Sequence, residues 1–598
     1  MSISTEKFNI RINQYDGWQT SRDSDDITQN KSPNVLNVRF NGSHVRGAKG
    51  YELIGTRNNT EGEITAQYTY TRGDGEERMV RVRDDGSTGT LEWWDATNEE
   101  WYTLLASLTT AKIMGFAEFN TATTNNLIFC NGVENLSKWT GAITRLTSAV
   151  SASDTTINVS DTTDFPSTGT IIYNGTEIAY TGKTATTFTV GSAHASAGAD
   201  DGVAQAADDS THSGITKGNI LVSAKDRLWI AGQPGSPNAL DYSDEGAFST
   251  FTGGSNRSDS GTETFFNIGG AVTGLSEKGD EMIVLGEDGA DGFKFAYPTS
   301  TTKAPIYREI FRAKGQGCTR HQSVFKVNNE VYFTNKNGVA SIADLEGTEK
   351  VFNRSITRDI LPTLQGYDFS ESASIFFEKE QILLVSCKSD EDFPANDTVI
   401  GIEFYTDREN NQRLALTRFD WIVNAWAILD DKLYAGSSLE QNSYRCFHTN
   451  QNDGAPRTIR YATKRFNFTD PFQEKGNRLA AVRGFIKDGS DIDVEILYNA
   501  GFKGTKPKTI ESTGVYVSNQ TLNTIGAFSL GTNPIGATLD EVSDLKRFLV
   551  YLDLGVDYTW NDVQLIFSSQ TDGGTFLIDY IGLVIDNEGF ASSDNLTI

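Results

Sequence analysis

Short runs of alternating apolar and polar residues, separated by turns rich in Gly, Asn and Asp, recur along most of the chain. Alternation with a period of two residues predicts β-strands with one buried face. Seven such segments begin with a strand that has a central apolar residue. In chain order these residues are Met79, Leu127, Leu228, Met282, Val331, Leu383 and Leu433.

The separations between these seven residues are 48, 101, 54, 49, 52 and 50, so five of the six are close to 50. A repeat of this length that contains several strands is typical of propeller blades, because a single four-stranded sheet cannot bury both of its faces alone. The pattern therefore predicts an all-β protein with a β-propeller of about seven blades. An irregular series of β-hairpins is the alternative, since strand pairs recur in any β-protein.

The separation of 101 contains a stretch, residues 149–210, that is richer in Ser, Thr, Ala and Asp. Within it, the strand Thr170–Tyr173 leads through Asn174-Gly175 into a second strand, which predicts a hairpin with a two-residue type I′ turn. The stretch after Val190 is small and acidic without apolar periodicity, which is typical of a mobile loop. We therefore predict a small inserted β-module with a flexible tip, placed between two blades.

The tip of this module has four aspartates, which are Asp200, Asp201, Asp208 and Asp209. Such a composition stays hydrated and repels phosphate. The tip is thus a candidate acidic gate that faces a channel or an end of the molecule. A solvated decoration of the outer wall is the alternative.

Both ends of the chain differ from the repeats. The last segment has long alternating strands, which predict a C-terminal β-sandwich, and the first residues are rich in Asn, Asp and Gly, which predicts an extended arm. Helix is scarce, with one short candidate at Ile356–Leu364. The predicted division is an N-terminal arm at 1–65, the propeller at 66–148 and 211–454, the module at 149–210 and the sandwich at 455–598.

The chain has 598 residues and a formal net charge of −27, from 52 Lys and Arg against 79 Asp and Glu. This charge disfavours a protein that binds nucleic acid tightly through a basic face. The same charge is compatible with DNA that slides past without adhering, and also with solubility alone.

The sequence predicts no enzyme and no cofactor. It has no GxSxG, HExxH, GxxxxGK[ST] or dinucleotide-binding glycine motif, and its five histidines are scattered. The four cysteines have no metal-ligand spacing and are expected to be buried free thiols in a reducing cytoplasm. The longest apolar run, near Trp421–Leu429, is too short to cross a bilayer, so we expect no membrane-spanning segment.

Three stretches resemble bacteriophage virion proteins. VRGAKGYELIGT at Val45–Thr56 and the segment Asp226–Phe251, which contains DRLWIAG and ALDYSDEGAFSTF, resemble the propeller-bearing nozzle or hub proteins of short-tailed phages. These are also called tail tubular protein B or packaged-DNA stabilization proteins. The segment Asp161–Val190, with a Phe-Pro pair before a Glu-Ile-x-Tyr strand, is similar to a small module that recurs in phage structural proteins.

This resemblance implies a structural protein of the virion tail, synthesised in the host cytoplasm. It implies a homo-oligomer, a hexameric ring, below the portal and adaptor proteins, with tail fibres attached to it. The ring would close the DNA exit and conduct the genome during ejection, without specific DNA binding. The alternative function is a glycan-binding or glycan-degrading tail or fibre protein that acts on the host surface.

Overall fold

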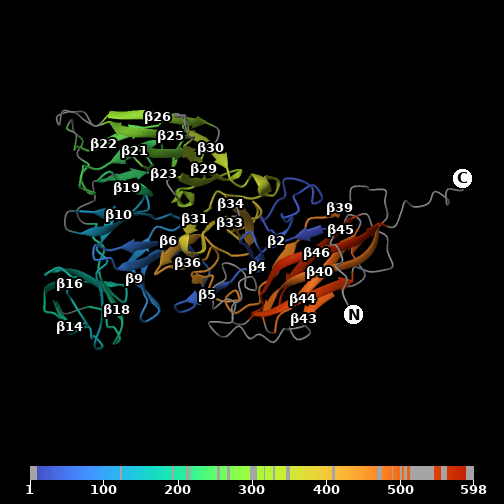
Figure 1. The fold of residues 1–598 in the computed structure, drawn as a ribbon. Coiled ribbons are helices and arrows are strands. Elements are labelled where there is room, and N and C mark those ends of the chain that lie inside the picture. The colour runs from blue at the N-terminus through green and yellow to red at the C-terminus, as the bar shows by residue number, and fades with distance from the viewer. Residues whose placement is uncertain are drawn as a thin grey trace.

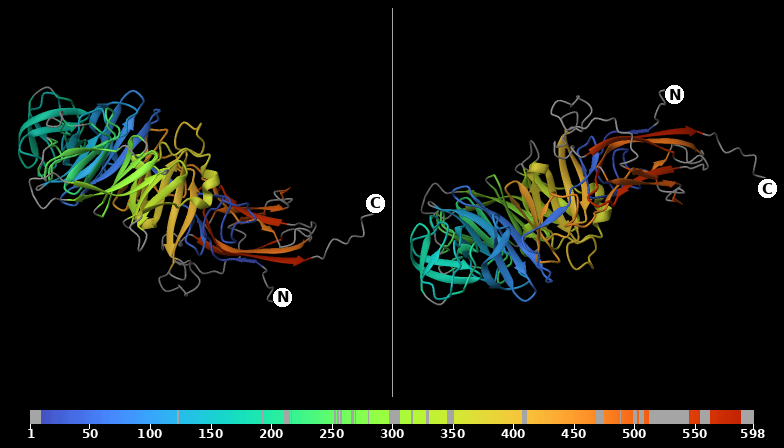
Figure 2. Two further views of the ribbon diagram at one scale, coloured as in Figure 1. Left: turned by 90° about the horizontal axis from the view of Figure 1, so that it is seen from above. Right: turned by 90° about the horizontal axis from the view of Figure 1, so that it is seen from below.

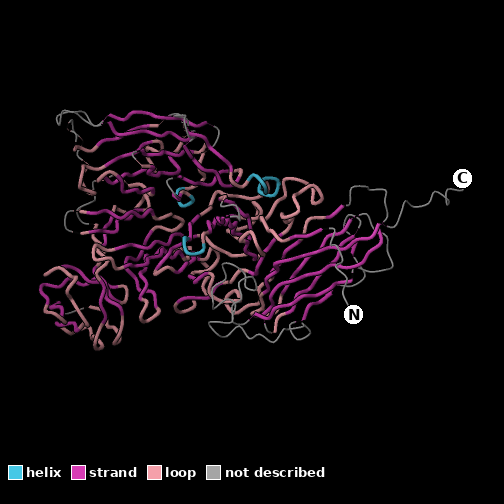
Figure 3. The backbone as a smooth tube through the Cα atoms, viewed as in Figure 1, coloured by secondary structure: helices cyan, strands magenta, loops and turns pink. Residues whose placement is uncertain are grey.

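The computed structural model describes most of the chain between residues 10 and 587. The described residues are 10–121, 124–191, 194–209, 215, 217–251, 253, 256, 258–265, 268, 270–279, 281–296, 306–314, 317–327, 330–344, 351–406, 411–467, 475–487, 489–498, 502–503, 508–511, 545–553 and 562–587. They form an all-β structure (Figure 3). A 3-10 turn, η2 (Arg358–Ile360), and the helix α1 (Leu361–Leu364) lie where the sequence predicts a short helix.

Seven antiparallel sheets follow one another along the chain, each with three or four strands (Figure 1). In chain order they are β6 (Glu63–Thr71), β7 (Glu77–Asp84), β8 (Gly89–Asp95) and β9 (Glu100–Leu108); β10 (Gly115–Asn120), β11 (Asn125–Cys130) and β12 (Ser137–Trp139); β19 (Ile220–Ala224), β20 (Arg227–Ala231), β21 (Ala239–Tyr242) and β22 (Gly261–Thr264); β23 (Val272–Lys278), β24 (Glu281–Gly286), β25 (Gly289–Ala296) and β26 (Ile306–Lys314); β27 (Phe325–Val327), β28 (Glu330–Asn335), β29 (Gly338–Asp344) and β30 (Val351–Ser355); β31 (Ser374–Phe377), β32 (Ile382–Cys387), β33 (Thr398–Thr406) and β34 (Gln412–Phe419); and β35 (Ala425–Leu429), β36 (Lys432–Gly436), β37 (Ser443–Cys446) and β5 (Tyr51–Ile54).

The seven marker residues occupy equivalent places in these sheets. Each lies in the second strand of its own sheet, from Met79 in β7 to Leu433 in β36. All seven are at most 1% exposed. The spacing near 50 residues therefore follows a repeated sheet, whose second strand is covered on both faces by its neighbours.

The series of sheets closes on itself. The first strands of the first four sheets contact one another in the order β6, β10, β19 and β23. Those of the last three do the same in the order β27, β31 and β35. The two series are connected because β23 contacts β28 and the 3-10 turn η1 (His321–Ser323). The last first strand, β35, packs against β6 of the first sheet. The seventh sheet is completed by β5 from the N-terminal segment, with Tyr444 opposite Leu53.

The N-terminal segment differs from the predicted extended arm, because its strands belong to sheets made mainly by distant parts of the chain. Besides β5, it has β1 (Ile10–Ile12), β2 (Val35–Leu36), β3 (Val38–Phe40) and β4 (Val45–Gly47). β1 and β4 pair with β46 (Phe576–Asn587), and β2 pairs with β38 (Ile459–Ala462). Strands of two to four residues are too short to show alternation, so the sequence pattern could not identify them.

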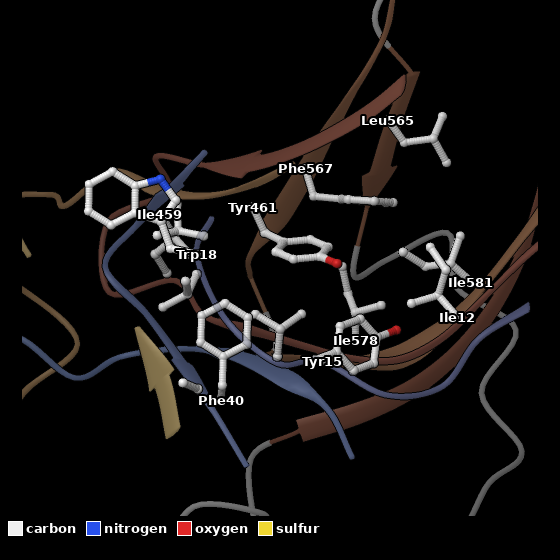
Figure 4. Close-up of a cluster of buried hydrophobic side chains, with 14 of the residues drawn as sticks. Ile12, Tyr15, Trp18, Phe40, Ile459, Tyr461, Leu565, Phe567, Ile578 and Ile581 are labelled. Atoms are coloured by element: carbon white, nitrogen blue, oxygen red, sulfur yellow. The ribbon is translucent and has the colours of Figure 1, made fainter. Parts of the chain in front are cut away.

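The C-terminal region has two sheets, which are joined by these N-terminal strands. One contains β1, β3, β4, β40 (Lys475–Lys487), β44 (Leu545–Asp553) and β46; the other contains β2, β38, β39 (Phe466–Asn467), β41 (Asp491–Tyr498), β42 (Phe502–Lys503), β43 (Lys508–Glu511) and β45 (Asp562–Ser569). Their side chains meet in one core, where Tyr461 and Phe567 of one sheet face Ile578 and Ile581 of the other (Figure 4). Each such buried side chain contributes about 1.5–3 kcal/mol.

The inserted module is a six-stranded sheet with a core of its own. It contains β13 (Ile143–Arg145), β14 (Thr156–Asn158), β15 (Gly169–Tyr173), β16 (Thr176–Lys183), β17 (Thr187–Val190) and β18 (Gly202–Gln205). The hairpin between β15 and β16 is confirmed, with Tyr173 opposite Thr176. Asn174 and Gly175 have φ of 45° and 69°, as a type I′ turn requires.

The module begins and ends at different residues from those predicted, and it lies inside the second sheet. Its first strand starts at Ile143, before residue 149. After β18 the chain returns to β12, where the backbones of Lys138 and Asp208 pair with N–O distances of 3.0 and 2.9 Å. The module therefore interrupts the second sheet after its third strand, instead of joining two sheets. The seven marker residues give the position of only one strand per sheet. Their spacing therefore could not show where within a sheet the module is inserted.

Candidate functional site

The four predicted gate aspartates do not form a separate flexible tip. Asp201 accepts a hydrogen bond from the Gly198 backbone at 2.8 Å, and Asp208 forms an ion pair with Lys138 at 3.1 Å. Asp209 accepts a hydrogen bond from Asn135 at 3.3 Å.

Asp200 is exposed, and its backbone oxygen accepts a hydrogen bond from Asn98 of the first sheet at 2.8 Å. The four residues are thus spread along a segment that is fastened to the first two sheets.

The small residues of this segment are explained by close packing. Val203, Ala204 and Ala206 are buried. A Cβ atom at Gly202 would lie 2.6 Å from the ring of Tyr102 and 2.8 Å from that of Trp93. The composition that predicted a mobile loop is therefore what allows β18 to lie against aromatic rings of the first sheet.

Two arginines fasten the module to the first sheet. Arg145 of β13 places Nε 2.8 Å from Asp95 Oδ2, and its Nη2 donates to the other carboxylate oxygen. Arg72 reaches Asp164 of the module at 2.7 Å. Because the Asp95 side chain is only 3% exposed, loss of Arg145 would leave a buried carboxylate without its ion-pair partner.

Replacing Arg145 with methionine is expected to loosen the module without unfolding the sheets. Hydrogen bonds to charged groups contribute about 1.5–3 kcal/mol, so amide exchange in residues 143–205 should accelerate by roughly tenfold or more. Amides of β23 to β25 serve as the internal control. Unchanged exchange in the module, measured by mass spectrometry, would show that packing alone holds it.

A cavity of about 430 Å³ lies where the seven first strands begin. Every sheet contributes to its wall, at or just before its first strand. The residues that line it are Ala66, Gln67, Tyr68, Ile113, Met114, Gly115, Phe116, Asn219, Ile220, Val272, Thr273, Thr319, Arg320, His321, Gln322, Val324, Ala373, Ser374, Ala425 and Trp426. The sheets thus surround an open central cavity of the size of small-molecule sites.

Arg320 is the charged residue of this wall. It is 9% exposed, and its Nη1 donates to the backbone oxygen of Glu371 at 2.8 Å. Burial lowers the pKa of Arg320 to about 10, while the nearby Glu371 and Glu63 act to raise it. The guanidinium therefore remains positively charged at neutral pH.

His321 has a structural part in the same wall. Its Nδ1 accepts a hydrogen bond from the Leu275 backbone at 3.4 Å. Burial lowers the pKa of His321 to about 4, so the ring is neutral at pH 7. It thus joins η1 to β23 and adds no charge to the cavity.

Among the described residues that line the cavity there is no carboxylate. The nearest acidic groups that affect Arg320 have partners of their own: Glu63 accepts a hydrogen bond from Asn424 at 2.7 Å, and Glu371 lies 3.3 Å from Lys388 Nζ. Within the described part of the chain, no group of three or more His, Cys, Asp or Glu could hold a metal ion. The wall therefore offers one cation, amides and hydroxyls.

The four cysteines are buried free thiols, as predicted. Burial raises the pKa of Cys318 to about 11 and keeps the pKa of Cys387 well above its ordinary value. These side chains are neutral core residues and not nucleophiles.

Sequence reasoning missed Arg320 and its neighbours as a group. The cavity residues come from seven separate segments, and only the closure of the sheets brings them together. No local motif surrounds Arg320, whose sequence context is GCTRHQS.

No family model matches this chain, and no curated protein matches its sequence. A crystal structure of a protein from Lactobacillus plantarum is similar to 63% of this chain and 88% of that one, with 8% identity and a TM-score of 0.31. Such a likeness carries no argument about activity. None of the helices in the described residues is long and apolar enough to span a membrane.

Proposed function

We propose that the closed series of sheets is a seven-bladed β-propeller and that the C-terminal sheets form a β-sandwich. The contacts between successive first strands and between β35 and β6 support the propeller. The pairing of β5 with β37 supports a closure in which an N-terminal strand completes the last blade. The shared core of the two C-terminal sheets supports the sandwich.

We propose that the chain is a structural protein of a phage tail, a nozzle or hub subunit that assembles with copies of itself into a ring. A hexamer is the first stoichiometry to test. One observation supports this most: the molecule is elongated, with the inserted module at one end and the C-terminal sheets at the other (Figures 1 and 2). A subunit of this shape offers separate surfaces to a neighbouring subunit, to an adaptor and to fibres.

The way in which these ends are held also supports a mechanical role. The module is fastened by Arg145 and Arg72, and the C-terminal sheets share strands with the N-terminal segment. A net charge of −27 per subunit, repeated around a ring, favours passage of DNA without adhesion. In this proposal the repulsion comes from the whole subunit. Asp200, Asp208 and Asp209 fasten the module to the first two sheets, and Asp201 bonds within the module.

A glycan-degrading function finds less support in the cavity. Glycosidases use two carboxylates that flank the scissile bond, at about 5–9.5 Å from each other. The lining of the central cavity, as far as the structure describes it, includes neither Asp nor Glu.

Native mass spectrometry of the purified chain tests the proposal. We expect a closed oligomer, with about six times the subunit mass of 65.5 kDa as the first expectation. Electron microscopy of the same sample should show rings. A chain that stays monomeric at micromolar concentration, both alone and in tail extracts, and that releases reducing sugar from host polysaccharide would favour the enzymatic alternative.

A further inference from the structure

The guanidinium of Arg320 has unused hydrogen-bonding capacity. Of its nitrogens, only Nη1 forms a hydrogen bond within the described residues, and Nε is buried without a partner there. A buried donor without a partner costs about 1–3 kcal/mol, and more when it is charged. A planar guanidinium is suited to bind a carboxylate through two parallel N–H donors.

Two amides of the same wall have unused acceptors. Gln322 Nε2 donates to the Thr65 backbone oxygen at 3.1 Å, and Gln67 Nε2 contacts the sulfur of Met79 at 3.1 Å. The Oε1 atoms of Gln322 and Gln67 are buried and have no partner among the described residues. These oxygens require a donor such as a hydroxyl group.

An aromatic surface forms another part of the wall. The rings of Tyr68 and Phe116 are stacked, with centroids 5.3 Å apart and an angle of 19° between their planes. Trp426 belongs to the same cavity, and its Nε1 donates to the Ala373 backbone at 3.3 Å. The C–H faces of a sugar ring pack well on such apolar surface, while its hydroxyls need polar partners.

We propose that the central cavity binds a small hydroxylated carboxylate of the sugar-acid class. Arg320 would bind the carboxylate, and the amide groups of Gln67 and Gln322 would turn toward the cavity so that their oxygens accept hydrogen bonds from hydroxyl groups. The cavity volume of about 430 Å³ is within the range of about 300–1,000 Å³ that is typical of ligand sites. This site is independent of ring assembly, so either proposal can fail while the other stands.

Titration calorimetry of the full chain with D-glucuronate tests the site. D-glucose keeps most of the hydroxyls but lacks the carboxylate, acetate has the carboxylate without hydroxyls, and sulfate is an inorganic anion. We expect saturable binding of glucuronate, at least about tenfold tighter than that of each of the three comparison compounds, since a charged hydrogen bond contributes about that factor or more. Absent binding of glucuronate, or equal binding of sulfate or glucose, would overturn the proposed ligand class.

Variants locate the binding. Arg320→Met removes the charge and keeps much of the volume, and Gln322→Leu removes an amide from a partly exposed side chain. The control is Arg547→Met on the exposed face of β44. Glucuronate affinity should fall at least about tenfold in Arg320→Met, several-fold in Gln322→Leu and not at all in the control.

If Arg320→Met does not fold, Gln322→Leu decides the outcome. Wild-type affinity in a folded Gln322→Leu protein would then overturn the site, as would wild-type affinity in a folded Arg320→Met protein.

Discussion

Replacing Arg39 with methionine is expected to lower the free energy of unfolding by about 3–5 kcal/mol, because it leaves a buried carboxylate without its partner. Arg39 lies in β3, and its Nε is 2.6 Å from Oε1 of Glu403 in β33. Their side chains are 8% and 3% exposed. Arg39 Nη1 also lies 3.0 Å from Glu380 Oε2. Urea unfolding followed by tryptophan fluorescence measures the loss.

A matched control is Lys31→Met. Lys31 also joins the N-terminal segment to a distant part of the chain, through Asp359 at 3.0 Å, but the Asp359 side chain is 41% exposed. Exposed ion pairs contribute about 0–1 kcal/mol, so this variant should differ little from the wild type. Similar losses in the two variants would contradict the argument from burial.

The double variant Arg39→Met with Glu403→Met separates the ion pair from its isolated charges. Replacing both partners with apolar residues should restore most of the loss that Arg39→Met causes, because no unpaired charge remains. Glu403 Oε2 also accepts a hydrogen bond from the Phe40 backbone at 2.9 Å, so this backbone donor loses its acceptor in the double variant. A small residual loss is therefore expected.

The repeated sheets could be predicted from the sequence because their signal is local. Each second strand is a run of five to eight residues between turns, and Met79 to Leu433 mark the same place in each. The hairpin at Asn174-Gly175 was equally predictable, since both residues readily adopt positive φ.

The closure of the structure was not predictable in the same way. β5 pairs with β37 across almost 400 residues, and β1, β3 and β4 contribute to a sheet whose other strands begin at residue 475 or later. Residues near Gly202 misled the prediction, because small side chains fit two different situations. They are common in mobile loops, and they are also required where a strand lies against large rings such as Trp93.

The central cavity depends on this closure as well. Gln67 lies in β6, whereas Arg320 and Gln322 lie in the connection before β27, and none has a sequence signature. A buried arginine can be recognised as a candidate binding residue only from a structure, which shows which of its N–H donors lack a partner.

Removal of the inserted module is expected to destabilise the protein strongly at one set of boundaries and to leave the sheets folded at another. Replacing residues 149–210 removes β18 and the segment that pairs with Lys138. It also removes the backbone oxygen of Gln205, which accepts the Trp139 indole hydrogen bond at 3.0 Å. Because Trp139 is 1% exposed, this variant should lose at least about 3 kcal/mol or fail to fold.

A shorter excision follows the strand pairing. The Leu146 amide donates to the Asp201 oxygen at 3.0 Å, and the next pair is Arg145 with Gly202. Replacing residues 147–200 with Asn-Gly should therefore join β13 to β18 through a two-residue type I′ turn. In the wild type, Leu146 and Val203 pack in the core of the module, which the shorter variant lacks. Changing both residues to threonine avoids exposing two apolar side chains.

This shorter variant should fold with the sheets intact, and its unfolding free energy should fall by only about 2 kcal/mol, because the removed Ile172 packs in the core cluster of the first two sheets. Urea unfolding of both variants, with amide exchange in β12 as a local probe, distinguishes them. Equal stability of the two would mean that the segment after Asp201 does not support the second sheet.

Because its sheets are preserved, the shorter variant also tests the role of the module. If the module controls genome retention in the proposed ring, particles that carry this variant should release DNA early. Normal retention would limit the module to the outer surface.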